Sequence, residues 1–148
     1  MKKTVLALAA ILACISASAQ LNVKSSREAT KTIATLRTGF VKLCAAEDCF
    51  YFTLPSSNKF ESPQLFYLGK DPDAAIQTLD DLVKMIAPDK VGTSVEVENG
   101  PSGTCTILVE KQVGVTVLYF SFPGCAGLFS TSKGELEKMK AALVKWKK

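Results

Sequence analysis

The sequence predicts an α+β fold, a single domain with an antiparallel sheet of about five or six strands and two amphipathic helices packed on one face. Short runs of β-branched and aromatic residues, separated by turn residues, indicate strands in two groups. A stretch of helical periodicity follows each group, after Asp71 and after Ser132. Strand groups that each end in a helix favour this class over a parallel α/β arrangement.

The first twenty residues are typical of a secretory signal peptide. A Met-Lys-Lys start precedes an apolar run over residues 5–15, and residues 17–19 read Ala-Ser-Ala, an A-x-A cleavage signal. The lysine start and the short length resemble bacterial secretory signals. The run is about a dozen residues long, whereas a membrane-spanning helix needs roughly 20. We expect removal of residues 1–19 and export to the periplasm or the medium. Lipidation at Cys14, which would anchor the protein to a membrane, is the alternative.

The rest of the chain, residues 20–148, has the length of one domain with its own hydrophobic core. It contains no second apolar run long enough to span a membrane, so we expect no transmembrane segment. Removal of Lys2 and Lys3 lowers the formal net charge from +4 to +2. A net charge this small does not indicate a nucleic-acid partner, because domains that bind nucleic acids are usually strongly basic.

Two strand-then-helix halves, about 25–88 and 92–148, divide this domain in the sequence. An offset of 61 residues places Cys44 on Cys105 and Asp71 on Ser132. The strands between these positions align badly. A duplicated unit and a coincidence of two similar units are therefore both open interpretations.

The segment that opens the first half is ambiguous. Ser25 and Glu28 have the spacing of a capping box, and Ala29, Ile33 and Leu36 would then share one helical face. The Thr and Ile residues of the same stretch instead favour a strand. We expect the helix, with the strand as the alternative.

Strands and a capped helix follow in the first half. Residues 41–44 and 49–54 indicate a hairpin, and residues 65–68 indicate a third strand after a loop rich in Ser and Pro. Asp71 is the expected N-cap of a helix whose first position is a proline. Pro88 is expected to end that helix.

The second half carries the most regular pattern of the chain. Residues 94–98 alternate with period two, and residues 104–110 and 115–122 are longer strands, so the three together predict an antiparallel meander. Ser132 and Glu135 form a second capping box ahead of the last helix. The side chains expected beneath the two helices are Ile76, Leu79, Val83, Ile107, Val109, Leu118, Phe120, Leu136, Met139, Leu143 and Trp146.

Four cysteines remain after the expected cleavage, and in an oxidising compartment an even number indicates disulfides. We expect Cys44 to pair with Cys49, across a hairpin with a four-residue loop that places the two directly opposite. Cys125, in a turn-rich stretch, is expected to fold back to Cys105. A buried free thiol at Cys105 is the alternative, and the spacings do not suggest a zinc site.

The chain contains no histidine. This excludes Ser-His-Asp hydrolysis, Cys-His proteolysis and His-ligated metal sites. Glu96 and Glu98 share one strand face, which indicates a solvated surface rather than a catalytic pair, because a glycosidase needs two carboxylates facing each other across a cleft. We therefore expect no catalytic residues, no metal and no cofactor.

Outward aromatics and the lysine-rich last helix supply the candidate interaction surface. It comprises Tyr51, Tyr67, Tyr119, Lys138, Lys140 and Lys145. Aromatics on an outer strand face can line a groove, and lysines can meet an acidic partner or lipid head groups. The sequence thus predicts an exported, non-catalytic binding module for a protein, peptide, glycan or lipid. An envelope-associated lipoprotein or surface-attached protein is the first alternative, and a hydrolase or thiol-redox enzyme the second.

Overall fold

The computed structural model describes residues 30–148, which form an α+β fold with two four-stranded antiparallel sheets and two helices. Strand order follows the sequence in each sheet, β1-β2-β3-β4 and β5-β6-β7-β8, so each sheet is a meander of hairpins. The signal peptide, the alternative at Cys14 and the capping box at Ser25 lie outside the described residues.

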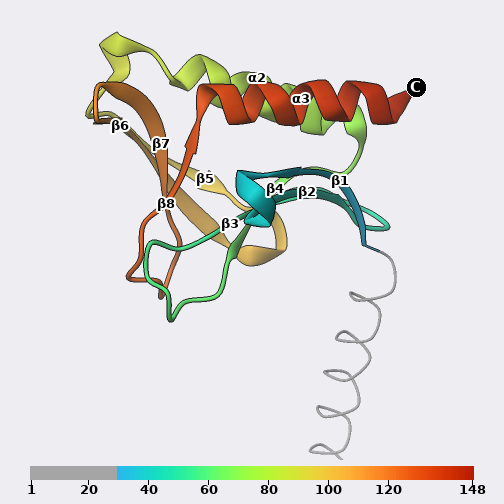
Figure 1. Ribbon diagram of the computed structural model, residues 1–148, viewed down its shortest axis with the longest axis horizontal. Helices are drawn as coiled ribbons and strands as arrows, with labels where there is room; N and C mark the ends of the chain where they lie inside the picture. Colours follow the sequence, from blue (N-terminus) through green and yellow to red (C-terminus); the bar gives the residue numbers. More distant parts are fainter. Residues whose placement is uncertain (1–29) are drawn as a thin grey trace, which may run out of the picture. The chain divides into compact units, whose positions relative to one another are not determined.

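Each sheet is followed in the chain by one helix (Figure 1). The first half consists of β1 (Lys31–Leu36), β2 (Val41–Ala45), β3 (Phe50–Leu54), β4 (Gln64–Gly69) and α2 (Pro72–Met85). The second half consists of β5 (Ser94–Glu98), β6 (Thr104–Gln112), β7 (Val115–Ser121), β8 (Phe129–Ser132) and α3 (Lys133–Lys147). Four strands and then a helix are thus the element order of both halves.

The α+β class is confirmed, but the expected single sheet of five or six strands is wrong in detail. The helix expected through Leu36 is a strand, β1, which pairs with β2 on both sides of a register shift between Thr32 and Ala34. Its β-branched residues suit a pleated surface, and local capping signals do not outweigh strand pairing. The four-residue strand β8 was not predicted, because a run this short between turn residues carries little periodicity.

Both predicted helix starts are confirmed. The Asp71 carboxylate accepts the backbone N–H of Ala74 at 2.9 Å, and Ser132 and Glu135 form the capping box at the start of α3. Each pair satisfies N–H groups that the first helical turn leaves without an intrahelical partner. Asp71 and Ser132 are separated by the 61-residue offset seen in the sequence. The two helices can therefore be compared position by position.

The helices lie side by side above the sheets, and one cluster of buried side chains joins all the layers (Figure 1). Eight of the expected core residues are buried: Leu79, Ile107, Val109, Leu118, Phe120, Leu136, Met139 and Leu143. Ile76 and Val83 are partly buried against this cluster. Trp146 is 38% exposed, so its assignment to the core was wrong. It lies near the end of α3, where its ring meets Phe50 edge-on with centroids 5.2 Å apart.

A turn of each half is tied to the last strand of the other half. Arg37, after β1, donates to the Ser130 carbonyl of β8 at 2.8 Å and forms a two-pronged ion pair with Glu135. Burial alone would raise the pKa of Glu135, but the hydrogen bonds from Arg37 and the Ser132 backbone N–H outweigh it and lower that pKa. In the second half, Asn99 plays the corresponding part, bonding to β4.

The loop between β3 and β4 and the loop between β7 and β8 also bind each other through hydrogen bonds. The Glu61 carboxylate accepts the backbone N–H groups of Ala126 and Gly127 at 2.7 and 2.9 Å, and the Ser56 hydroxyl at 2.7 Å. The Ser56 hydrogen bond, followed by that of Ala126, lowers the pKa of Glu61. A Cβ at Gly127 would lie 1.9 Å from the Ser56 hydroxyl oxygen, so this close approach requires glycine.

Candidate functional site

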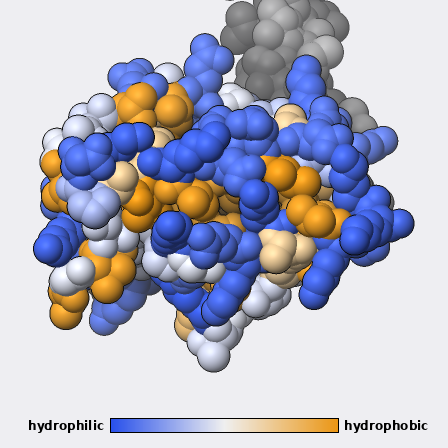
Figure 2. Space-filling model, turned by 90° about the horizontal axis from the view of Figure 1, so that it is seen from above, coloured by the Kyte–Doolittle hydropathy of each residue, from blue (hydrophilic) through white to orange (hydrophobic). Residues whose placement is uncertain are grey.

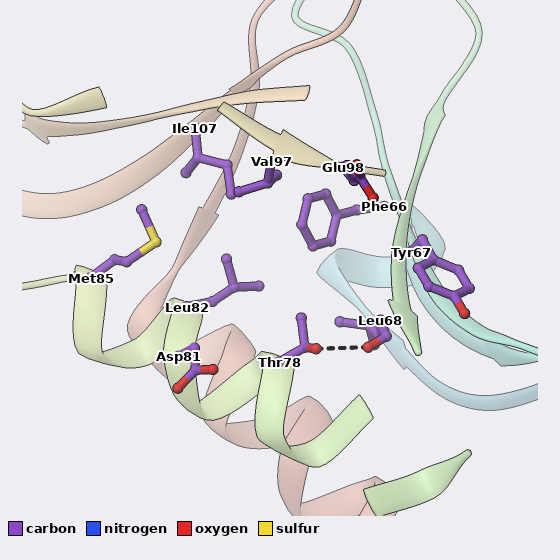
Figure 3. Close-up of a pocket in the computed structure, with 10 residues that line it drawn as sticks. All are labelled: Phe66, Tyr67, Leu68, Thr78, Asp81, Leu82, Met85, Val97, Glu98 and Ile107. Carbon is purple, nitrogen blue, oxygen red and sulfur yellow. Dashed lines mark hydrogen bonds between the residues drawn. The ribbon is translucent and has the colours of Figure 1, made fainter. Parts of the chain in front are cut away.

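A groove of about 290 Å³ opens between β4, β5, β6 and α2 (Figure 3). It lies next to the point at which Asn99, directly after β5, bonds to β4. Ten residues line it: Phe66, Tyr67, Leu68, Thr78, Asp81, Leu82, Met85, Val97, Glu98 and Ile107. Residues from both halves therefore build this site.

The interior of the groove is apolar and its borders carry acid groups. Phe66, Leu82 and Ile107 are buried and face the space between the sheets and α2 (Figure 3). The exposed carboxylates of Asp81, on α2, and Glu98, on β5, lie at the borders. An apolar interior with a few polar groups at the opening is the usual composition of a binding pocket.

Hydrogen bonds hold the groove walls in place and satisfy polar groups that line them. The Thr78 hydroxyl donates to the Leu68 carbonyl at 2.7 Å, which fixes α2 against β4 (Figure 3). At the border, Asp81 accepts from Gln77 at 3.0 Å and forms an ion pair with Lys84 at 3.2 Å. Both members of that pair are more than half exposed, so solvent screens it and it contributes little stability.

The second half of the chain offers a comparison for the α2 side of this groove. Shifted by 61 residues, the α2 positions Thr78, Asp81, Leu82 and Met85 correspond to Met139, Ala142, Leu143 and Trp146 of α3. Met139 and Leu143 are fully buried, and α3 contacts β1. The face of α2 that borders the groove carries Thr78 in place of a methionine and Met85 in place of a tryptophan. Thr78 is smaller than the fully buried Met139 and borders the groove, whereas Trp146, at the position that matches Met85, is itself 38% exposed.

Comparison of the chain with protein-family models, with curated proteins and with solved structures finds no match.

A second hollow of about 350 Å³ lies at the turn between β6 and β7. It is lined by Pro88, Val91, Lys111, Gly114 and Thr116, of which none is buried. Its walls are exposed or half-exposed residues, so it offers an apolar ligand little buried area to cover. The groove beside α2 is the better candidate.

The three tyrosines of the predicted interaction surface do not form one site. Tyr51 and Tyr67 face each other across β3 and β4, whereas Tyr119 lies on β7 opposite Ser130. Tyr67 borders the groove, but its ring lies on the far side of β4 from Phe66 (Figure 3). That ring covers Gly100, where a Cβ would come within 2.8 Å of it.

The predicted lysines lie on α3, away from the groove. Lys140 forms an ion pair with Asp80 at 2.5 Å, and Lys147 forms one with Asp73, so these two tie α3 to α2. Lys138 and Lys145 are exposed. Seen from the helix side, the surface is largely hydrophilic, with apolar groups visible between the polar ones (Figure 2). The role of Lys140 is thus at least partly structural.

The structure shows no disulfide among residues 30–148, where Cys44, Cys49, Cys105 and Cys125 are free. The expected geometry of the first pair was wrong. Cys44 lies opposite Tyr51, because Ala45 pairs with Phe50, so Cys44 and Cys49 are not directly opposed. Cys105 is buried among core side chains of β6, and Cys125 is partly buried in the loop before β8.

Neither a metal centre nor a membrane-crossing helix is found between residues 30 and 148. No cluster of three or more His, Cys, Asp or Glu side chains in this range is placed to hold a metal ion. Within it, neither α2 nor α3 has the length and apolar content that crossing a membrane requires.

The Cys105 thiol should be almost inert in the reduced native protein. Burial raises its pKa to about 11, so very little nucleophilic thiolate exists at pH 8. We expect iodoacetamide to modify Cys105 roughly 100-fold or more slowly in the native protein than in the same chain unfolded in urea. Peptide mass mapping after timed quenching measures both rates. Equal rates would show that Cys105 is accessible and would reopen a thiol-based activity.

The groove residues were missed in the sequence for a definite reason. Phe66, Leu82 and Ile107 have the pattern of ordinary core residues. Nothing in that local pattern distinguishes residues of a filled core from residues that line an open groove. The usable signal was the 61-residue offset. It pairs Thr78 with Met139 and thereby marks a polar position on a helix face that is apolar in the other half.

Proposed function

We propose that this protein is a small exported binding module that accepts an apolar group in the groove between β4, β5 and α2. The observation that carries the proposal is the open groove itself. Met139 of α3 is fully buried, whereas Thr78, at the matching position of α2, and Met85 border about 290 Å³ that is open to solvent beside buried apolar walls. An apolar cleft with a polar border is the default binding site of a protein.

The size and border of the groove limit what it can take. Pockets for drug-sized ligands hold roughly 300–1,000 Å³, so this one lies just below that range. It suits one or two apolar side chains, or the apolar part of a small ligand, better than a large cofactor. Asp81 and Glu98 at the border favour a ligand that is neutral or positively charged near its point of entry.

Filling the groove with the side chains of the other half tests the proposal. We expect the neutral fluorophore N-phenyl-1-naphthylamine to bind the native protein and to bind Met85→Trp at least 10-fold more weakly, because the larger side chain occupies the site. Thr78→Met, which copies Met139, should act in the same direction. Fluorescence titration gives the affinities, and circular dichroism with thermal unfolding confirms that each variant is folded.

The matched control is Lys145→Trp, which adds the same ring at an exposed position of α3. It should bind the fluorophore as the native protein does. The proposal fails if the native protein does not bind the fluorophore, or if folded Met85→Trp and Thr78→Met bind it with unchanged affinity. Equal weakening by Lys145→Trp would likewise place the binding outside the groove.

A further inference from the structure

One wall of the groove is an unpaired strand edge. β5 is the first strand of the second sheet, and no strand of residues 30–148 pairs with its other side. Such an edge presents a row of N–H and C=O groups ready to pair with another extended chain. β5 is also well exposed, with 41% of the Val95 surface accessible. Its edge and the groove are therefore parts of one continuous surface.

The register of β5 fixes which backbone groups the edge offers. The Asn99 N–H donates to Gly103 at 2.6 Å, and the Thr93 carbonyl accepts from Val109 at 2.9 Å, so the odd-numbered residues bond to β6. Hydrogen-bonded residues alternate along an antiparallel ladder. The even-numbered residues Ser94, Glu96 and Glu98 therefore turn their N–H and C=O groups toward the open edge.

Side chains along β5 divide into an apolar face and an acidic face. Val95 and Val97 pair with Ile107 and Cys105, so they share the core face, and Val97 lines the groove. Glu96 and Glu98 lie on the opposite, exposed face, and Glu98, the last residue of β5, also borders the groove. A strand added at this edge would alternate in the same way. Its apolar side chains would enter the groove, and its intervening side chains would lie beside two carboxylates.

With the groove taken as the binding site proposed above, we propose that its occupant is an extended protein segment with alternating apolar and basic residues. This segment is added in register to the free edge of β5. Main-chain hydrogen bonds to Ser94, Glu96 and Glu98 supply the pairing, and the groove selects the apolar side chain. Lys or Arg on the outer face would lie opposite Glu96 and Glu98. Opposite charges across strands stabilise such a pair, and like charges destabilise it.

The same charges argue against a second copy of this chain as the occupant. Antiparallel pairing of two β5 strands over their full length would place Glu96 opposite Glu96 and Glu98 opposite Ser94. The two central carboxylates would then repel each other at the middle of the new ladder. A basic segment meets no such repulsion, so the edge discriminates in favour of a different partner.

The test uses a synthetic capped peptide of sequence Ser-Lys-Val-Lys-Val-Lys-Ser and its counterpart with Glu in place of Lys. We expect the basic peptide to bind the native protein at least 10-fold more tightly than the acidic one by isothermal titration calorimetry. The double variant E96K/E98K should reverse this preference. Amide exchange followed by NMR should slow at Glu96 and Glu98 when the basic peptide binds, since their N–H groups become hydrogen-bonded.

Two matched variants separate backbone pairing from charge. Glu96→Pro removes an N–H that points to the open edge and leaves the ladder with β6 intact, whereas Glu96→Gln keeps that N–H and removes only the charge. Glu96→Pro should weaken the basic peptide at least 10-fold and Glu96→Gln by about 3-fold. Equal affinities of the two variants, or unchanged exchange on β5, would overturn strand addition.

The outcomes also separate this inference from the groove proposal. Binding of the fluorophore without binding of the basic peptide would overturn the inference and leave the groove as a small-ligand site. Loss of both would overturn the groove proposal as well. Sedimentation equilibrium of the protein alone tests whether a second copy of the chain occupies the edge. A dimer that Glu96→Pro dissociates would show that a second copy, not a basic segment, occupies the edge.

Discussion

Replacement of Phe120 by Ala should lower the free energy of unfolding by about 3–5 kcal/mol, the cost of truncating a fully buried aromatic ring. Phe120 belongs to the second sheet, and its ring centroid lies 6.0 Å from that of Phe52 and 5.0 Å from that of Phe66, both in the first sheet. It also lies near Phe122. Its removal therefore opens a cavity where the two sheets meet, and total stabilities are only about 5–15 kcal/mol.

Urea denaturation measures this loss, with Phe120→Leu and Phe60→Ala for comparison. Phe120→Leu keeps most of the apolar volume and should cost about 1.5 kcal/mol or less. Phe60 is 86% exposed, and its truncation should change the stability by less than about 0.5 kcal/mol. A loss below about 1 kcal/mol for Phe120→Ala would mean that the sheets do not share one core.

Replacement of Asn99 by Ala should be almost as damaging, although it removes only a small polar side chain. The Asn99 amide donates to the Leu65 carbonyl at 2.9 Å, and its oxygen accepts the Tyr67 N–H at 2.7 Å. Asn99 is fully buried, so its loss leaves two backbone groups of β4 without these partners. We expect a loss of about 2–4 kcal/mol, whereas Ser102→Ala in the same exposed turn should be nearly neutral.

The isosteric change Asn99→Asp adds a pH signature to that result. An ionised carboxylate can accept from Tyr67 but cannot donate to Leu65, and it carries a buried charge, so its pKa should rise. Because the folded pKa lies above the unfolded one, the variant should gain stability as the pH falls through the folded pKa. Urea midpoints at pH 7 and pH 5 for the variant and the native protein measure the difference. A variant whose midpoint stays unchanged relative to the native protein would show that Asn99 is not the bridge.

Local signals explain the parts of the fold that were predicted correctly. Asp71 and Ser132 were placed as N-caps because capping depends on residues within one helical turn, and both are confirmed. The meander of the second half followed from period-two alternation. β1 was misassigned because its capping signal and its β-branched residues disagreed, and pairing with β2, which no local pattern encodes, decided between them.

The groove and the division into two sheets depend on contacts between distant residues. The sequence alone determined the class and two helices with their capped starts at an offset of 61 residues, because each depends on neighbours a few positions apart. Only the tertiary structure decided that Asn99 joins β4 to the second half and that Thr78 and Met85 face an opening. Whether a seam is packed or open depends on side-chain volumes brought together from both halves, and no single stretch of sequence contains that sum.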